Sequence, residues 1–296
     1  MKEYNEFIAG REEDGMALRD FVKKKLMLSR RNTIKLKKNE GFRVNGNRAY
    51  LNLLLKEGDR IEILQAEEES ENILPEQMEL DIIYEDEYMI VINKPADMPV
   101  HPSRNHIMGT LANGLMHYLM GEGRSVRIRP VNRLDRNTTG LVVFAKSSHI
   151  QYMLSAKTYK EDFLKEYIAL VEGVPEKDSG VIDLPIAREH PQTIRRVVRD
   201  DGERAVTHYK IIEKFGDCSL IGLQLETGRT HQIRVHMSSI GHPLLGDDLY
   251  GGSTEKISRQ ALHACRIHMR HPVSKELMVF EAPLPKDMAE LLAGMI

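Results

Sequence analysis

The sequence predicts an α+β fold in two parts, a small basic α/β domain followed by a larger domain built mainly on strands. In residues 79–296, apolar and β-branched runs typical of strands are interspersed with helical patterns, without the strict alternation of a βαβ array. An acidic stretch, residues 66–78, separates this region from residues 1–65 and is typical of an exposed linker. A chain of 296 residues is long enough for one large and one small domain.

The N-terminal segment predicts two basic helices and a hairpin. Asp14 could cap the first helix, and residues 29–38 form the second basic segment. Residues 41–46 predict a short strand and an Asn-Gly turn, and residues 58–64 alternate as a closing strand. Four apolar side chains of the first helix share one face: Leu18, Phe21, Val22 and Leu26.

Charge is distributed unevenly along the chain, although the formal net charge is only −2. Residues 16–65 carry 13 Lys and Arg against five Asp and Glu, a local charge of +8. Residues 66–87 carry ten Asp and Glu and no Lys or Arg. This pattern indicates that the N-terminal part binds a polyanion, although a solvated helix face would give a similar pattern.

In the large domain, polar blocks lie next to predicted strands at residues 80–84, 88–93, 141–145 and 165–171. One block places Asp135 between two arginines, in a loop that leads into the buried strand 141–145. A carboxylate held on a rigid element in this way could serve chemistry. From these residues alone, a structural Asp that caps a turn is an equal alternative.

A second polar block, residues 227–247, predicts a helix that Thr230 caps and that ends at Gly241. Arg234 would lie in its first turns and Arg229 just before it. Positive side chains would therefore converge on a helix N-terminus, which favours binding of a carboxylate or a phosphate.

Together, four motifs resemble one family. They are Arg133-Leu-Asp-Arg-Asn-Thr-Thr-Gly140, Lys165-Glu-Tyr167, Thr227-Gly-Arg-Thr-His-Gln-Ile-Arg234 and Leu262-His-Ala264. In this order they resemble the RNA pseudouridine synthases, in the group that acts on large-subunit ribosomal RNA. Residues 14–65 resemble an S4-like RNA-binding domain. The resemblance implies a pseudouridine synthase fold, a mixed and mostly antiparallel β-sheet flanked by helices and loops.

The resemblance also implies the site residues. Asp135, Tyr167 and Arg234 would be catalytic: Asp135 would act at C1′ of the target uridine, as a nucleophile or by removing a sugar proton. Arg234 would pair with it, and the ring of Tyr167 would stack on the base while its hydroxyl assists proton removal from C5. The remaining expected substrate-binding residues are Arg133, Leu262, Arg229 and His231.

Three positions depart from the family pattern. Asn132 stands where many members have His, Thr139 where Ser is usual, and Asp97 where Gly commonly follows Lys-Pro-Ala. Thr139 keeps the hydroxyl group. We expect Asn132 to bear on the choice of RNA target, and Asp97 to change loop flexibility and local RNA contact.

The predicted isomerase needs no cofactor or metal. His231 and His236 are spaced i, i+5 and do not share a helical face, so we expect no metal site. We expect ribosomal RNA as the partner, with transfer RNA as the alternative. The chain shows no signal peptide and no apolar run of the ~20 residues that a membrane span needs. We therefore expect a cytoplasmic protein. We also expect it to be a monomer.

Two alternative functions make different demands on these residues. A non-catalytic RNA-binding protein predicts loss of Asp135, Tyr167 or Arg234, and all three are present. A carboxylate-dependent glycosidase needs a paired acid and base, and no second carboxylate has a sequence setting like that of Asp135.

Overall fold

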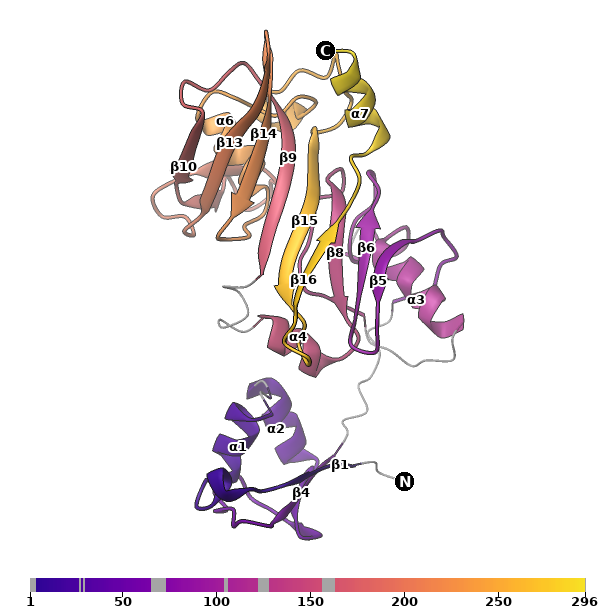
Figure 1. The fold of residues 1–296 in the computed structure, drawn as a ribbon, viewed down its shortest axis with the longest axis vertical. Coiled ribbons are helices and arrows are strands. Elements are labelled where there is room, and N and C mark those ends of the chain that lie inside the picture. Colours follow the sequence, from indigo (N-terminus) through magenta and orange to yellow (C-terminus); the bar gives the residue numbers. More distant parts are fainter. Residues whose placement is uncertain are drawn as a thin grey trace.

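The computed structural model describes residues 4–26, 28, 30–64, 73–103, 106–121, 128–155 and 163–295. These residues form two separate main β-sheets, as Figure 1 shows, one within residues 4–64 and one within residues 81–281. We call residues 4–64 the small unit. The large sheet is mixed and mostly antiparallel, since only β8 (Thr139–Ala145) and β15 (Leu262–Arg270) pair in parallel. The predicted α+β class is confirmed.

The small unit has a four-stranded antiparallel sheet in the order β1-β4-β2-β3. Leu18, Phe21 and Val22 of the first helix are buried, as their spacing predicts, and pack in one core with strand residues. The Asn45-Gly46 turn is also confirmed, because both residues have the positive φ that the tight hairpin requires. Its elements are β1 (Tyr4–Ile8), a 3-10 turn (Arg11–Glu13), α1 (Leu18–Lys24), α2 (Arg30–Lys38), β2 (Phe42–Val44), β3 (Asn47–Arg48) and β4 (Arg60–Leu64).

Two features of the small unit differ from the prediction. Asp14 does not cap α1, because the helix begins after Ala17 and the Asp14 carboxylate accepts a hydrogen bond from the backbone N–H of Glu57. The strand β1 was not predicted, since its residues alternate weakly. It is formed by pairing with β4, a contact that lies 52–60 residues away in the chain.

The large sheet runs in the order β10-β13-β14-β9-β15-β8-β6-β5, with β16 paired to β15 and β7 to β8. The four strands predicted for this domain are confirmed as β5, β6, β8 and β9. The remaining bounds are β5 (Asp81–Glu85), β6 (Met89–Lys94), β7 (Arg129–Pro130), β9 (Leu164–Glu172), β10 (Ser179–Asp183), β11 (Ile186–Arg188), β12 (Arg196–Val198), β13 (Val206–Phe215), β14 (Cys218–Leu225) and β16 (Leu277–Glu281).

Helices pack against the strands of this sheet. The first, α3, packs with β6 and β8 in one buried cluster, while side chains of α6 pack against β9, β14 and β15. Strands β11 and β12 form a separate two-stranded ribbon. The helices are α3 (Leu111–Gly121), α4 (Ser148–Ser155), α6 (Gln232–Ser239), α7 (Lys286–Ala293) and a 3-10 turn (Asp248–Tyr250).

The predicted linker is too long at its C-terminal end. Ile73 is buried in the cluster around α3, and Asn113 donates a hydrogen bond to the backbone carbonyl of Leu74 at 2.7 Å. Residues 73–78 thus pack on the large domain because they supply apolar and backbone groups that α3 needs. Residues 66–72 of the predicted linker lie outside the described residues.

A glycine allows the central strands to approach closely. Gly140 has φ +110°, and a Cβ there would lie 2.2 Å from the carbonyl oxygen of Ala264 on β15. Any larger residue would push β8 and β15 apart. The motif glycine therefore lets the loop that carries Asp135 sit beside the start of β15.

In the described part of the chain, no helix is both long and apolar enough to cross a bilayer.

Candidate active site

One pocket of the large domain brings together all seven residues that the sequence predicts for the site. It lies beside the starts of β8 and β15, where Asp135 precedes β8, Leu262 opens β15 and Tyr167 belongs to the neighbouring β9. The lining residues are Arg133, Leu134, Asp135, Thr138, Tyr167, Leu225, Arg229, His231, Gln232, Ile233, Arg234 and Leu262. Segments up to about 130 residues apart in the chain thus meet at one place.

The Asp135 carboxylate pairs with the guanidinium of Arg234, and a second carboxylate, that of Asp247, holds this guanidinium in place. Nη1 of Arg234 lies 3.2 Å from Oδ2 of Asp135, while its Nε and Nη2 donate to the two carboxylate oxygens of Asp247 at 2.7 and 2.8 Å. The Asp247 side chain is fully buried, and that of Asp135 is 24% exposed. The bidentate pair orients Arg234, so one N–H remains directed at the accessible carboxylate.

The two carboxylates stabilise the positive charge of Arg234. Burial alone would lower the pKa of Arg234, but the hydrogen bonds and charge of Asp247, followed by those of Asp135, raise it above its usual value. Arg234 is therefore a permanent cation. Sequence reasoning assigned no role to Asp247. The only signal for it was its place at the end of the polar block 227–247.

His231 forms the other side of this arrangement. Its Nδ1 lies 2.8 Å from the hydroxyl of Tyr250, and that hydroxyl accepts a hydrogen bond from the backbone N–H of Arg196. The His231 tautomer sets which of these two groups donates, and the other ring nitrogen, Nε2, lies 3.9 Å from Asp135 Oδ2. Burial lowers the pKa of His231, so the ring is neutral at pH 7. Tyr250 also packs its ring 4.9 Å from the Arg234 guanidinium carbon.

The start of α6 differs from the prediction. Thr230 is not its cap: the residue before the helix is His231, with φ 58° in the left-handed region and no side-chain cap. Gln232 fixes the turn instead, since its Oε1 accepts from Thr227 Oγ1 and the Arg229 backbone N–H, and its Nε2 donates to the Val206 carbonyl.

Two apolar groups form the floor of the pocket. The Tyr167 ring and Leu262 are 7% and 4% exposed and pack in one cluster with Ile233 of α6. Burial, and then the negative charge of Asp135, raise the pKa of the Tyr167 hydroxyl. Tyr167 is therefore neutral near pH 7, which suits a stacking surface and a hydrogen-bonding hydroxyl better than a phenolate base.

Two buried cations hold the backbone of the Asp135 loop. Lys94, 1% exposed, donates to the carbonyls of Pro95 and Arg136 at 2.7 and 2.9 Å. Arg259 donates to the carbonyl of Asn137 at 3.1 Å. The carbonyls of the two consecutive residues that form the turn after Asp135 are thus each held by a different buried side chain.

These two cations differ in how their charge is balanced. Arg259 pairs bidentately with Asp287, at the start of α7, at 2.7 and 2.8 Å. Burial lowers the pKa of Lys94 to about 7, although the charge of Asp135 partly opposes this effect. Neither cation was identified from sequence, because each contacts main-chain oxygens that no sequence motif marks.

Two other arginines of the pocket, Arg133 and Arg229, have different surroundings. Arg229 is tied to Glu203 and to the Arg204 carbonyl. Arg133 is exposed, and within the described residues its guanidinium has no hydrogen bond or ion pair. Arg133 is therefore the more available of the two for an external ligand.

The residues at the three departures from the family pattern each make local contacts. The Asn132 amide donates to the Leu141 carbonyl and accepts from the Val143 N–H, so it extends the edge of β8. Thr139 is buried, 2.9 Å from His263 Nδ1. Asp97 has φ 58°, where glycine is favoured, and its carboxylate pairs with Arg136 at 2.8 Å.

The described residues contain no group of three His, Cys, Asp or Glu side chains that could hold a metal ion. Among the described residues that line the pocket, Asp135 is also the only carboxylate. A glycosidase would need a second accessible acid, and Asp247 is buried against Arg234. The geometry thus favours chemistry that uses one carboxylate.

Comparison with known proteins agrees with these features. Residues 88–239 match the family model described as RNA pseudouridylate synthase. The chain is 40% identical over 288 residues to the Bacillus subtilis protein "Uncharacterized RNA pseudouridine synthase YhcT", covering 97% of this chain and 95% of that protein. It is 41% identical over 252 residues to the "Ribosomal large subunit pseudouridine synthase D" of Escherichia coli O6:H1, covering 80% and 77%.

A solved structure shows the same fold. "Human RNA Pseudouridylate Synthase Domain Containing 4" superposes with a TM-score of 0.60 at 24% sequence identity. The superposition covers 72% of this chain and 92% of that chain.

Proposed function

The chain belongs to the RNA pseudouridine synthase family, and from this premise we propose that it isomerises specific uridines of large-subunit ribosomal RNA, with Asp135 as the catalytic carboxylate. One observation carries the assignment of the site. Among the residues that the structure describes, Asp135 is the single accessible carboxylate of a pocket in which Tyr167, Arg234 and Leu262 converge as the motifs require. The names of several relatives at 40–41% identity support ribosomal RNA as the substrate.

The reaction breaks the C1′–N1 bond of uridine, turns the detached base and forms a C1′–C5 bond, after which C5 loses its proton. Asp135 could form a bond to C1′ as N1 leaves, or it could remove a sugar proton to give a glycal. In both routes the carboxylate must be ionised and correctly directed. Arg234, oriented by Asp247, favours both conditions.

The apolar floor accounts for how the detached base is retained. A uridine must leave its stack to reach a carboxylate inside a pocket. The Tyr167 ring and Leu262 would then hold the base while it turns, and the neutral Tyr167 hydroxyl would assist transfer of the C5 proton. We assign Arg133 to the RNA backbone or to the gap that the flipped base leaves, since its guanidinium is exposed.

The small unit would supply much of the affinity for RNA. Its segment 16–65 has a local charge of +8, which suits the phosphate backbone, and its two helices and hairpin resemble an S4-like domain. We propose that the enzyme acts as a monomer in the cytoplasm.

A map of pseudouridines in total RNA tests this proposal. RNA from a strain that lacks the gene should lose pseudouridine at one or a few positions of large-subunit ribosomal RNA. Wild-type protein should restore them, whereas Asp135→Asn should not. Loss only from transfer RNA would reject the ribosomal target, and restoration by Asp135→Asn would reject the catalytic assignment.

A further inference from the structure

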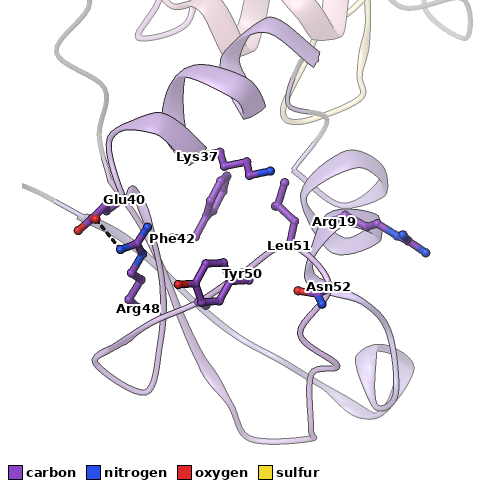
Figure 2. Close-up of a pocket in the computed structure, with 9 residues that line it drawn as sticks. Arg19, Lys37, Glu40, Phe42, Arg48, Tyr50, Leu51 and Asn52 are labelled. Atoms are coloured by element: carbon purple, nitrogen blue, oxygen red, sulfur yellow. Dashed lines mark ion pairs between the residues drawn. The ribbon is translucent and has the colours of Figure 1, made fainter.

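The small unit contains a hollow of about 280 Å³ that lies far from Asp135 in sequence and shares no residue with its pocket. The hollow is built where α1, the end of α2 and the β2–β3 hairpin meet (Figure 2). Its volume is at the lower limit for small-ligand pockets, so it suits one base-sized group. The lining residues are Arg19, Lys37, Glu40, Phe42, Arg48, Ala49, Tyr50, Leu51 and Asn52.

An exposed aromatic ring forms part of its wall. Tyr50 is 61% exposed. In a unit with a small hydrophobic core, an aromatic ring of this size is normally buried. The guanidinium carbon of Arg48 lies 5.3 Å from the centroid of the Tyr50 ring. Phe42, which is 2% exposed, extends the apolar surface toward the core. Tyrosine and arginine planes are the surfaces on which proteins stack unpaired RNA bases.

Cations surround this aromatic surface. Figure 2 shows the Lys37 side chain reaching over the hollow above Phe42, on the side opposite Tyr50. Within the described residues, the Lys37 ammonium has no hydrogen bond or ion pair. Among the same described residues, the Arg19 guanidinium has only one long contact, 3.8 Å, with the carboxylate of its neighbour Asp20. A phosphate next to a stacked base would therefore meet charges that the protein itself leaves largely unsatisfied.

One carboxylate argues against a simple anion site. Glu40 pairs with Arg48 at 2.5 Å, and its backbone has φ 55°, in the left-handed region. A carboxylate that is held at the rim can accept a hydrogen bond from the exocyclic amino group of a base. It would repel an isolated phosphate or an acidic side chain. The lining thus combines a stacking surface, a hydrogen-bond acceptor and flanking cations.

We propose that this hollow binds one unpaired nucleotide of the RNA substrate, with its base on Tyr50 and an adjacent phosphate near Lys37. The proposal rests on RNA being the substrate, as proposed above. It adds a second, non-catalytic contact between the protein and a base that is not paired within an RNA helix. The RNA would then be recognised at two unpaired nucleotides, the target uridine in the Asp135 pocket and a second one in the small unit.

The chain contains no tryptophan, so Tyr50→Trp introduces a single tryptophan, in the hollow, whose emission can be excited apart from that of the tyrosines. We would place this change in full-length Asp135→Asn protein, to prevent turnover. The probes are an RNA hairpin with one bulged adenosine, the same hairpin with an abasic bulge, and a fully paired hairpin. The bulged adenosine should quench the tryptophan, and the other two RNAs should leave its emission nearly unchanged.

Leu54 provides a matched control, because it is also 61% exposed in the same segment but does not line the hollow. Leu54→Trp should respond equally to the three RNAs. In binding titrations, Tyr50→Ala should weaken binding of the bulged hairpin by roughly 5- to 100-fold, the range for loss of one stacked base. Tyr50→Phe and Leu54→Ala should retain the preference for the bulged adenosine, and all variants should bind the abasic hairpin alike.

Equal emission of the Tyr50→Trp protein with all three RNAs would overturn the proposal. The same holds if Tyr50→Ala weakens binding to bulged and abasic hairpins equally. If a poly-glutamate peptide displaces RNA from the hollow and quenches the tryptophan emission to the same extent, the site binds an acidic protein partner. That result would reject the proposed nucleotide. Because Asp135→Asn removes catalysis, these results stand apart from the pseudouridine map, which tests the proposed reaction.

Discussion

The Asp135 pocket and the hollow of the small unit are both lined by arginines, one carboxylate and a tyrosine, yet they are built in opposite ways. In the Asp135 pocket, the Arg234 side chain is 8% exposed and bound to two carboxylates. In the hollow, Arg48 is 50% exposed and Tyr50 is 61% exposed. The first arrangement fixes atoms before the substrate arrives, as catalysis requires. The second leaves charges and a ring open, as adaptable RNA binding requires.

The largest effect should follow from breaking the buried pair. Asp247→Ala would leave the Arg234 charge buried with only one partner, and loss of one member of such a pair costs about 3–5 kcal/mol. We expect this loss in the free energy of unfolding, measured in urea, together with loss of activity. Asp248→Ala, an exposed acid next in the chain, is the control and should change little. A stable, active Asp247→Ala protein would show that the site is not preorganised by this pair.

The next effect concerns positioning of the loop by Arg259. Lysine keeps the charge but cannot bind Asp287 bidentately and also reach the Asn137 carbonyl. We expect Arg259→Lys to lower kcat by roughly 10- to 100-fold, the effect of a small misplacement of a catalytic group. KM for RNA should change little, since Arg259 lies away from exposed surface. Lys286→Ala, at an 87% exposed neighbour of Asp287, serves as the control. A change in KM alone would contradict the positioning role.

A pH measurement tests whether Lys94 is as buried as the arrangement implies. Its pKa is about 7 in the folded protein and near 10.4 in an unfolded chain. Between these values only the unfolded state binds the proton, so the folded protein should gain stability as pH rises from 7 to 9. The gain over Lys94→Met should be on the order of 2 kcal/mol in urea unfolding. An equal difference between the two proteins at both pH values would show that Lys94 titrates normally.

The smallest effect should appear in the open hollow. If Lys37 contacts a phosphate, Lys37→Ala should reduce the slope of log binding constant against log salt concentration by about one. Stability should hardly change, because the side chain is exposed. Lys214→Ala removes an exposed lysine that pairs with Asp178 in the large domain, and it should leave the slope unchanged. Equal slopes for Lys37→Ala and wild type would place the phosphate contacts elsewhere.

Much of the site could be predicted because the motifs name residues that touch one another. Asp135, Tyr167, Arg234 and Leu262 were inferred from sequence and line one pocket. The residues that hold them could not be inferred in this way. Asp247, Lys94 and Arg259 act through a side chain or a main-chain carbonyl that lies 13, 42 and 122 residues away. Such contacts depend on the register of the sheet, which local patterns do not encode.

The errors in the fold have a similar origin. Thr230 has the residue type of a helix cap, but Gln232 and the strand β13 determine where α6 begins. Residues 73–78 follow an acidic run, but α3 supplies a surface that orders them. In each case a tertiary contact overrides a local preference.

The central claim is that the Asp135 carboxylate performs chemistry within a site that is already assembled. Purified Asp135→Asn protein, mixed in excess with unmodified large-subunit ribosomal RNA, tests this most directly in a single-turnover assay. We predict RNA affinity and unfolding free energy close to those of wild type, with no detectable pseudouridine. Pseudouridine formation at the wild-type rate would contradict the account.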